Sequence, residues 1–221
     1  MMSTTFQRAR SPEQVAARRA AILAAAAEML AERPVADISL RELAGRVGLA
    51  KSNVLRYFDS REAIFLEVLD ETWTAWLDGL ELDPGRSRAR HARETRVATA
   101  IASSLIARPL LCELFGAMAA VLERNISLDV ARDFKSRFTA NTARLAELVR
   151  AAVPALDDAG ATHFAGATVV LVAGLWPYAT PTEVVAAASA ELGHPCGADL
   201  FAQGLTEGLV NQLVGLSARA G

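Results

Sequence analysis

Residues 38–65 read ISLRELAGRVGLAKSNVLRYFDSREAIF, and this stretch decides the fold of the N-terminal part of the chain. Ser39, followed three residues later by Glu42, has the spacing of a capping box, in which the two residues satisfy backbone N–H groups that a first helical turn leaves free. Apolar residues then recur at helical spacing as far as Gly48, a residue type that commonly ends helices. The stretch therefore predicts a helix of about two turns followed by a tight turn.

A second short helix is predicted after this turn, from about Ala50 to Tyr57. Val54 and Phe58 are four residues apart, so both should turn inward. The positions that are left facing outward are Lys51, Ser52, Asn53, Leu55, Arg56 and Tyr57. Two short helices around a glycine turn are typical of a helix-turn-helix, whose second helix enters the major groove of DNA. A solvated helical hairpin is the alternative interpretation of the same pattern.

The outward residues have the chemistry that DNA contacts require. Lysine and arginine neutralise phosphates or bond guanine edges, serine and asparagine read bases, and a tyrosine hydroxyl can fix the backbone register. Residues 1–62 also hold ten Lys and Arg against seven Asp and Glu, a net charge of +3. Since the whole chain carries −2, residues 63–221 carry −5. This asymmetry indicates a polyanionic partner for the first segment and a mild bias toward cationic ligands for the second.

Two longer helices are predicted on either side of this pair. Ser11 followed by Pro12 favours the start of a helix that continues to about Glu32. Asp59 with Glu62 three residues later predicts the cap of a fourth helix over about residues 60–80.

Over about residues 15–70 the sequence resembles the DNA-binding region of the tetracycline-repressor (TetR) family of bacterial regulators. The resemblance rests on the capped helix, on Val47-Gly48-Leu49, and on a second helix that ends in Tyr57-Phe58 before the next helix opens. It implies that Ser39 contacts a phosphate and that Arg41 contacts a base. The set of DNA-binding residues implied in this way is Ser39, Arg41, Lys51, Ser52, Asn53, Leu55, Arg56, Tyr57 and Arg61.

Three positions depart from the family pattern. Ala50 stands where the family usually has a serine or threonine cap, which removes about 1 kcal/mol of capping stabilisation. Leu55 replaces a common tyrosine and can contact a thymine methyl instead of a phosphate. Arg61 replaces the usual lysine and keeps its positive charge. The operator sequence of another member therefore does not transfer to this chain.

The rest of the chain is predicted to be helical as well. Residues 81–88 break the periodicity and indicate a hinge, after which helical patterns resume. Further helices are expected from Pro109, from Ser127 to about Val153, over the almost wholly apolar residues 159–177, after the capping box Thr180-Pro181-Thr182-Glu183, and over about residues 199–216. The predicted fold class is all-α: a three-helix head, residues 1–62, is linked by the fourth helix to a helical bundle, residues 63–221, that senses a ligand and dimerises.

Small residues in the last two long helices allow close helix approach. The TetR resemblance implies that these helices pack with their mates as a four-helix bundle in a homodimer, although they could equally close the core of a monomer. The residues expected at the dimer interface are Gly166, Val169, Val170, Ala173, Gly174, Gly204, Leu205, Gly208, Leu209 and Leu213. A two-fold dimer would place two recognition helices one DNA turn apart on a palindromic operator.

The resemblance also implies a ligand pocket in the body, between the helix after the hinge, the Ser127 helix and the apolar helix. Candidate lining residues are Trp73, Trp76, Phe115, Met118, Phe134, Phe138, Asn141, His163, Trp176 and Tyr178, although each could be plain core. An aromatic and methionine lining favours an apolar or amphipathic small-molecule effector.

The sequence contains no nucleophile motif, no phosphate-binding glycine loop and no metal-ligand spacing around its three histidines. We therefore expect no enzyme, no cofactor and no metal site. The two cysteines lie far apart, which fits a reducing cytoplasm. The apolar run 164–176 is shorter than the roughly 18 residues of a membrane span, and residues 1–10 lack an apolar signal core, so no membrane association is expected.

These observations together predict a cytoplasmic, ligand-responsive DNA-binding transcriptional regulator. We expect a repressor that binds double-stranded DNA at a palindromic operator and is released by a small-molecule effector. A helical interaction or ligand-sequestering module that has lost DNA binding is the alternative, because the head carries only a modest positive charge and a weakened cap at Ala50.

Overall fold

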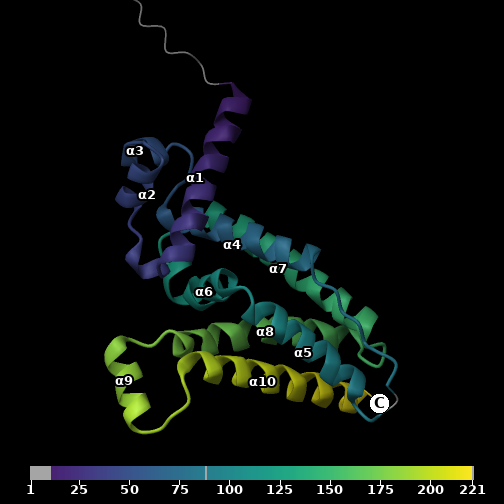
Figure 1. The fold of residues 1–221 in the computed structure, drawn as a ribbon. Helices are drawn as coiled ribbons and strands as arrows, with labels where there is room; N and C mark the ends of the chain where they lie inside the picture. Colours follow the sequence, from purple (N-terminus) through teal and green to yellow (C-terminus); the bar gives the residue numbers. More distant parts are fainter. Residues whose placement is uncertain (1–10, 88, 221) are drawn as a thin grey trace, which may run out of the picture.

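A computed structural model describes residues 11–87 and 89–220, and these residues form an all-helical molecule with no strand (Figure 1). Residues 1–10 of the predicted head, Arg88 at the end of the predicted hinge, and Gly221 lie outside the described residues. The helices are α1 (Pro12–Glu32), α2 (Leu40–Arg46), α3 (Lys51–Val54), α4 (Arg61–Asp78), α5 (Ala92–Ile106), α6 (Pro109–Ala117), α7 (Leu128–Ala152), α8 (Asp158–Ala179), α9 (Glu183–Glu191) and α10 (Gly197–Ala220). A 3₁₀ turn, Val35–Asp37, precedes α2, and a π-helical segment, Met118–Leu122, extends α6. The predicted all-α class is confirmed.

The head consists of α1, α2 and α3, and Figure 1 shows the two short helices lying beside α1. Its interior is closed by side chains that are almost completely buried, among them Ile22, Ile38, Leu43, Val54 and Phe58. The predicted inward orientation of Val54 and Phe58 is therefore confirmed. Burial of these side chains, each worth about 1.5–3 kcal/mol, holds two helices that are too short to be stable alone.

The long helix α4 connects the head to the body. It packs against α1 at one end and lies alongside α7 over its length (Figure 1). Its cap is Ser60, whose hydroxyl accepts a hydrogen bond from the backbone N–H of Ala63, and not Asp59 as predicted. The Asp59 carboxylate instead accepts a hydrogen bond of 2.8 Å from the Ser127 hydroxyl at the start of α7. Both residue types are good caps, and in the structure Ser60 serves as the cap while Asp59 contacts the start of α7.

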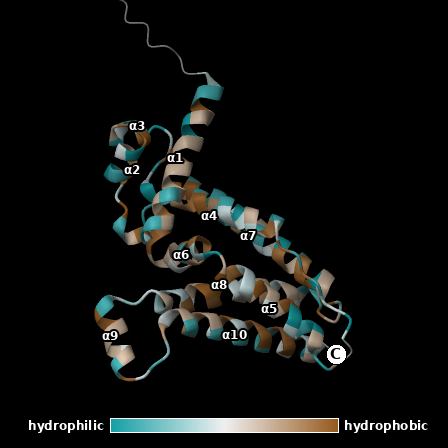
Figure 2. Ribbon diagram, in the orientation of Figure 1, coloured by the Kyte–Doolittle hydropathy of each residue, from teal (hydrophilic) through white to brown (hydrophobic). Residues whose placement is uncertain are grey.

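The body is built around α8 and α10, which pack against each other, with α5 against α10 and with α6 and α7 against α8. Gly204 and Gly208 of α10 face α8, where a Cβ at either position would lie 3.4–3.5 Å from Leu175 or Leu171, an ordinary van der Waals contact. Figure 2 shows apolar residues over much of α8, whereas α7 alternates between apolar and polar residues. The prediction that other helices pack against more than one side of α8 is confirmed, although Val170 keeps 70% of its surface exposed.

Within the described residues, α8 is the one unbroken helix that has the length and apolar composition of a membrane span. It is longer than the apolar run from which the sequence analysis excluded a span, because it begins at Asp158 and continues through Pro177. In the protomer, 39% of its apolar window is buried, and α6, α7 and α10 pack against it.

Three other boundaries differ from the predictions. The recognition helix α3 ends at Val54, and residues 55–57 form a turn. The helix is therefore shorter by about one turn than the predicted helix, which continued to Tyr57. Helix α9 is capped by Thr182, which accepts from the Val185 N–H, and the predicted capping box at Thr180 does not form. Helix α10 begins at Gly197 and continues to Ala220, which is longer than predicted at both ends.

Candidate nucleic-acid interface and ligand cavity

The first helix of the motif begins with the predicted capping box. The Ser39 hydroxyl accepts a hydrogen bond from the Glu42 N–H at 3.2 Å, and the Glu42 carboxylate accepts from the Ser39 N–H at 2.9 Å and the Ser39 hydroxyl at 2.7 Å. These bonds, with the Arg33 guanidinium 3.1 Å away, lower the pKa of Glu42 from 4.5 to about 2. The start of α2 is thus fixed by local bonds that stay intact over the physiological pH range.

The turn between α2 and α3 has the geometry of a Schellman motif. Gly48 adopts φ +65°, its N–H bonds the Gly45 carbonyl at 3.1 Å, and the Leu49 N–H bonds the Ala44 carbonyl at 2.8 Å. Because a side chain at φ +65° is strained, glycine is the residue type that suits this position. The turn sets the direction of α3, which starts two residues later without a side-chain cap at Ala50.

Most of the predicted DNA-binding residues lie on the surface of this motif. Ser39, Arg41, Lys51, Ser52, Leu55 and Arg56 are exposed, while Asn53 and Tyr57 are half-buried. Within residues 11–87 and 89–220, the cationic groups of Arg41, Lys51 and Arg56 make no ion pair. Cations without an internal partner are the ones that can neutralise phosphates at little desolvation cost.

Arg61 differs from these cations because its guanidinium has internal partners. It donates to the Ile38 carbonyl at 2.7 Å and to the Glu62 carboxylate at 2.8 and 3.1 Å, and its side chain keeps only 21% of its surface exposed. In this structure Arg61 therefore connects the start of α4 to Ile38, the residue before the Ser39 cap of α2. A DNA phosphate that contacts Arg61 would therefore share its guanidinium with Ile38 and Glu62.

Arg19 of α1, which the sequence analysis did not select, holds the end of the recognition segment in place. Its guanidinium lies 4.1 Å from the centre of the Phe58 ring and bonds both the Tyr57 carbonyl and the Glu67 carboxylate. It thereby joins α1, the residues after α3, and α4. The sequence shows only a basic residue on an amphipathic helix, so no local signal could have identified this role.

Beside Tyr57 the surface of α1 is hollowed. Gln14, Ala17, Arg18, Ala21 and Tyr57 line a depression of about 380 Å³. Gln14 and Arg18 are exposed polar residues at its edge. Arg18 and Tyr57 are 39 residues apart along the chain, and the fold brings them together at this depression.

Among the residues predicted to line a ligand pocket, four form a solid aromatic cluster. Trp73 meets Phe115 and Phe138 edge to face, with ring centres 4.9 and 5.0 Å apart, and Phe138 meets Phe134 at 5.9 Å. Asn141 lies beside them and donates a 3.0 Å hydrogen bond to Asp70. These side chains fill the space between α4, α6 and α7 and pack against one another instead of lining a cavity.

The other predicted pocket residues are dispersed. Met118 is half-buried in the π-helical segment, and His163 is exposed on α8. Tyr178 is 64% exposed and lines a separate hollow of about 430 Å³ with Val185 and Leu200, between the end of α8 and the exposed helix α9. Only Trp76 and Trp176 lie together on the wall of a larger cavity.

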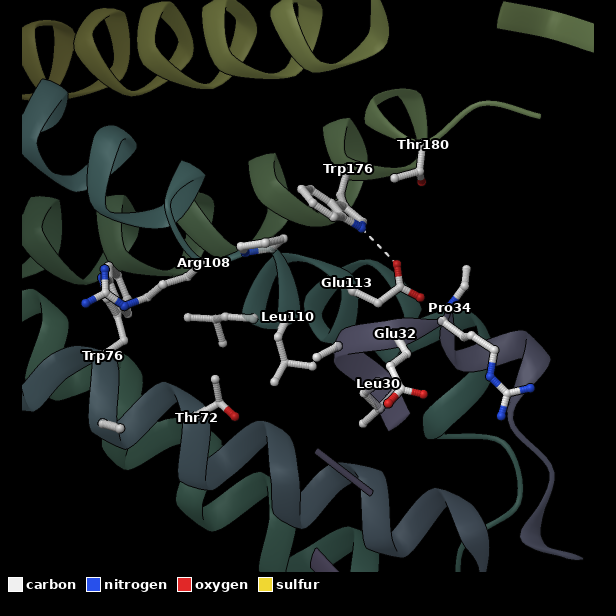
Figure 3. Close-up of a pocket in the computed structure, with 15 residues that line it drawn as sticks. Leu30, Glu32, Pro34, Thr72, Trp76, Arg108, Leu110, Glu113, Trp176 and Thr180 are labelled. Carbon is white, nitrogen blue, oxygen red and sulfur yellow. Dashed lines mark hydrogen bonds between the residues drawn. The ribbon is translucent and has the colours of Figure 1, made fainter. Parts of the chain in front are cut away.

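This larger cavity has a volume of about 540 Å³ and lies where the head meets the body (Figure 3). Its walls come from the end of α1 with the following residues, from the middle of α4, from the start of α6, and from the end of α8. The lining is mostly apolar, with Leu30, Trp76, Leu110 and Trp176 among its larger side chains. Its site differs from the predicted one because α1 and α6, and not α5 and α7, form most of the wall.

One carboxylate on the wall connects three parts of the molecule. Glu113 of α6 accepts a hydrogen bond of 2.9 Å from the backbone N–H of Val35, in the head, and one of 2.8 Å from the Trp176 indole Nε1–H of α8. Figure 3 shows the second bond at the edge of the cavity. A molecule that enters the cavity meets this connection directly.

Two family models match the chain. The model described as "Tetracyclin repressor-like, C-terminal domain" matches residues 70–220, and the model described as "Bacterial regulatory proteins, tetR family" matches residues 22–68. The chain belongs to the tetR family. The earlier resemblance is thereby confirmed, and it extends from the head into the body.

Named relatives and a solved structure agree with this assignment. The tetR-family chain is 45% identical over 53 residues to the HTH-type transcriptional regulator EthR of Mycobacterium tuberculosis, which covers 24% of each chain. It is 34% identical over 80 residues, 36% of each chain, to the HTH-type transcriptional regulator RutR of Escherichia coli. The matched segments therefore span roughly a quarter to just over a third of these relatives. A possible TetR family transcriptional regulator from Streptomyces coelicolor shares the fold, with a TM-score of 0.55 and 19% identity over 91% of this chain and 99% of that one.

The structure separates the predicted dimer-interface residues of this tetR-family chain into two groups. Leu205, Leu209 and Leu213 are fully buried and Val169 is 4% exposed, so all four belong to the core of the protomer. Gly204 and Gly208 face α8 of the same chain. The members left at least partly exposed on α8 are Gly166, Val170, Ala173 and Gly174, and a Cβ at either glycine would meet open space.

Within the described residues, no group of three or more His, Cys, Asp or Glu side chains is arranged to hold a metal ion. Burial raises the pKa of Cys112 to about 12, so this thiol stays protonated and acts as a small apolar side chain. Both named relatives are HTH-type transcriptional regulators.

Proposed function

We propose that the chain is a ligand-responsive transcriptional repressor that binds a palindromic operator as a homodimer. The observation that carries the proposal is the exposed face of the helix-turn-helix, on which Arg41, Lys51 and Arg56 have no ion-pair partner in the part of the chain that the structure describes. A capped α2 and a glycine turn hold this face on a rigid head. In this interpretation Ser52 and Asn53 read base edges, Leu55 contacts a thymine methyl, and Ser39 and Tyr57 contact the DNA backbone.

Dimerisation through α8 would supply the second recognition helix. Val170, 70% exposed, together with the small residues Gly166, Ala173 and Gly174, offers an apolar strip on which a second copy of α8 can pack closely. The two-fold axis would then place the recognition helices about 34–36 Å apart, one turn of DNA. We propose residues 1–62 as the DNA-binding head and residues 63–221 as the sensing and dimerising domain, in a cytoplasmic protein.

The connection between the two functions would run through α4. Its first turns pack in the head, and its later turns carry Thr72, Ala75 and Trp76 on the cavity wall. A ligand that fills the cavity would tilt α4 and change the separation of the recognition helices. A full switch from 1:99 to 99:1 occupancy requires a ligand preference of about 5.5 kcal/mol for the released state. Leu69→Pro, which breaks α4 between its two ends, should therefore abolish ligand-dependent release; normal induction in that variant would contradict this mechanism.

Selection of bound duplexes from a random DNA pool tests DNA recognition. The full chain should recover a palindrome with half-sites about one turn apart, and the double variant Arg56→Ala/Tyr57→Ala should recover none. Arg93→Ala is the matched control, since Arg93 is an exposed arginine of α5 in the body. The selected duplex should also bind with steep salt dependence, losing about 10³–10⁵ in affinity between about 50 and 200 mM salt for six to ten phosphate contacts.

A pool that remains random at low salt would contradict the proposal. The alternative of a helical interaction or ligand-sequestering module would then hold, provided that removal of any co-purified ligand does not restore selection. A selected site without two-fold symmetry would contradict the dimer alone.

A further inference from the structure

We propose that the 540 Å³ cavity binds an amphipathic anion, with a carboxylate-type headgroup held by Arg108 and an apolar body lying between Trp76 and Trp176. The inference rests on the proposed ligand-responsive function and specifies the chemical class of its effector.

The cavity has the size and lining of a small-molecule site. Its volume falls in the range of about 300–1,000 Å³ that such sites occupy. Two of the chain's three tryptophans line it, together with Leu30, Leu110 and Leu111. Such a lining buries an apolar or aromatic body, and the few charged groups on the wall decide which headgroup it carries.

Four charged side chains line the cavity, and three already have partners. The Glu32 carboxylate pairs with Arg46 at 3.1 Å, the Arg33 guanidinium pairs with Glu42 at 3.1 Å, and Glu113 accepts the two hydrogen bonds from Val35 and Trp176. These groups leave little capacity to recognise a further charge.

Arg108 is the fourth, and it has no carboxylate partner among residues 11–87 and 89–220. Its one internal bond is to the Ser104 carbonyl, at 2.7 Å, so most of the five N–H donors of the guanidinium are unused. The half-buried position of Arg108 excludes part of the solvent that would otherwise weaken an ion pair. An anionic headgroup is the chemistry that satisfies these donors, in the forked geometry that arginine offers to carboxylates.

The arrangement of the wall gives the ligand a direction. Arg108 and Trp76 both contact Ser104, the first through its carbonyl and the second through its hydroxyl at 3.0 Å, so they share one side of the cavity. Figure 3 shows Glu113 and Trp176 on the opposite side, with Leu110 between. The headgroup would thus lie beside Arg108, away from the carboxylate of Glu113, and the apolar body would extend over Leu110 toward Trp176.

This local chemistry outweighs the net charge of the body, from which the sequence analysis inferred a bias toward cations. Exposed charges farther away than about 8–10 Å are largely screened at physiological salt. The groups on the wall decide the selectivity, because they touch the ligand in a partly desolvated site.

Tryptophan fluorescence of the full chain, measured without DNA, tests the proposal. The probes are decanoate and 2-naphthoate as anions with an aliphatic and an aromatic body, decanol as a neutral molecule, and decyltrimethylammonium as a cation. We expect saturable binding of at least one carboxylate, tighter than that of decanol or the cation. Arg108→Gln should raise its Kd about ten- to a hundred-fold, Arg108→Lys should restore part of the affinity, and Arg93→Gln should leave the Kd unchanged.

Three outcomes would overturn the proposal: no saturable carboxylate binding up to about 1 mM, equal or tighter binding of decanol or the cation, or a carboxylate Kd that Arg108→Gln changes less than two-fold in protein whose circular dichroism shows it to be folded. The relative affinities of decanoate and 2-naphthoate then identify the body of the ligand. Because no DNA is present, these failures leave the duplex selection intact. Conversely, a chain that binds a carboxylate but selects no duplex supports this site and contradicts the proposed regulator.

Discussion

The Glu113 connection predicts a measurable coupling between the head and the end of α8. The carboxylate accepts one bond from the Val35 N–H at 2.9 Å and one from the Trp176 Nε1–H at 2.8 Å. Each hydrogen bond to a charged group contributes about 1.5–3 kcal/mol, and the half-buried position of Glu113 favours the lower end. Glutamine keeps the shape but offers one acceptor oxygen, so Glu113→Gln should lower the free energy of unfolding by about 1–2 kcal/mol. Glu113→Ala loses both bonds and should lower it by about 2–4 kcal/mol.

A double-mutant cycle isolates the bond to α8. Trp176→Phe keeps an aromatic ring against Phe201 but removes the indole N–H, so the cycle with Glu113→Gln should give a coupling energy of about 1 kcal/mol in urea unfolding. Amide hydrogen exchange should show faster exchange at Val35 in Glu113→Gln. Glu147→Gln, an exposed carboxylate of α7, is the control and should change stability by less than about 0.5 kcal/mol. Additive effects of the two substitutions, with a coupling below about 0.3 kcal/mol and unchanged exchange at Val35, would refute the reasoning.

Three further predictions concern the head. Ala50→Ser should raise the free energy of unfolding by about 0.5–1 kcal/mol, because it supplies the cap that α3 lacks; an unchanged melting temperature would contradict this. In the parent the folded pKa of Glu42 is depressed, so its contribution to stability is present above pH 4.5 and is lost as the pH falls toward 2. Ser39→Ala should raise this pKa toward 4.5 in an NMR titration, and an unshifted titration would show that Ser39 is not the main cause. Arg19→Met should weaken operator binding at least ten-fold by freeing the segment after α3, whereas wild-type affinity in a folded variant would show that Phe58 packing suffices.

Local rules predicted the elements of the head because the interactions that form them are local. The capping box at Ser39 satisfies N–H groups within three residues, and Gly48 adopts the positive φ that ends α2. The caps at Ser11 and Ser127 formed as predicted for the same reason. A sequence window of a few residues contains every atom involved in such a cap, so the residue pattern is sufficient to predict where the helix begins or ends.

Where two residues could cap the same helix, the sequence did not distinguish them. Asp59 and Ser60 both have suitable side chains; in the structure Ser60 is the cap, and Asp59 accepts a hydrogen bond from Ser127, the cap of α7. At α9, Thr182 and not Thr180 starts the helix. The choice depends on backbone direction and on contacts from distant segments, neither of which a spacing rule contains.

The residues predicted to line one pocket are dispersed in the structure for a related reason, and two of them, Trp76 and Trp176, lie on the cavity wall. Residue type identified Trp73, Phe115 and Phe138 as large aromatics, and a closed core and an open pocket are lined by the same types. In the structure these three rings pack edge to face and fill the space between α4, α6 and α7. The cavity appears instead beside Arg108 and Glu113, which the sequence presented as ordinary charged residues near a proline.

The sequence by itself thus determined the helical class, the helix-turn-helix and the exposed basic face of the recognition segment, because caps, turns and periodicity are encoded in neighbouring residues. The tertiary structure alone decided which apolar faces meet, that Leu205, Leu209 and Leu213 serve the core of the protomer, and where the molecule remains hollow. Periodicity shows that a face is apolar but not which partner covers it, since the partner lies tens of residues away along the chain.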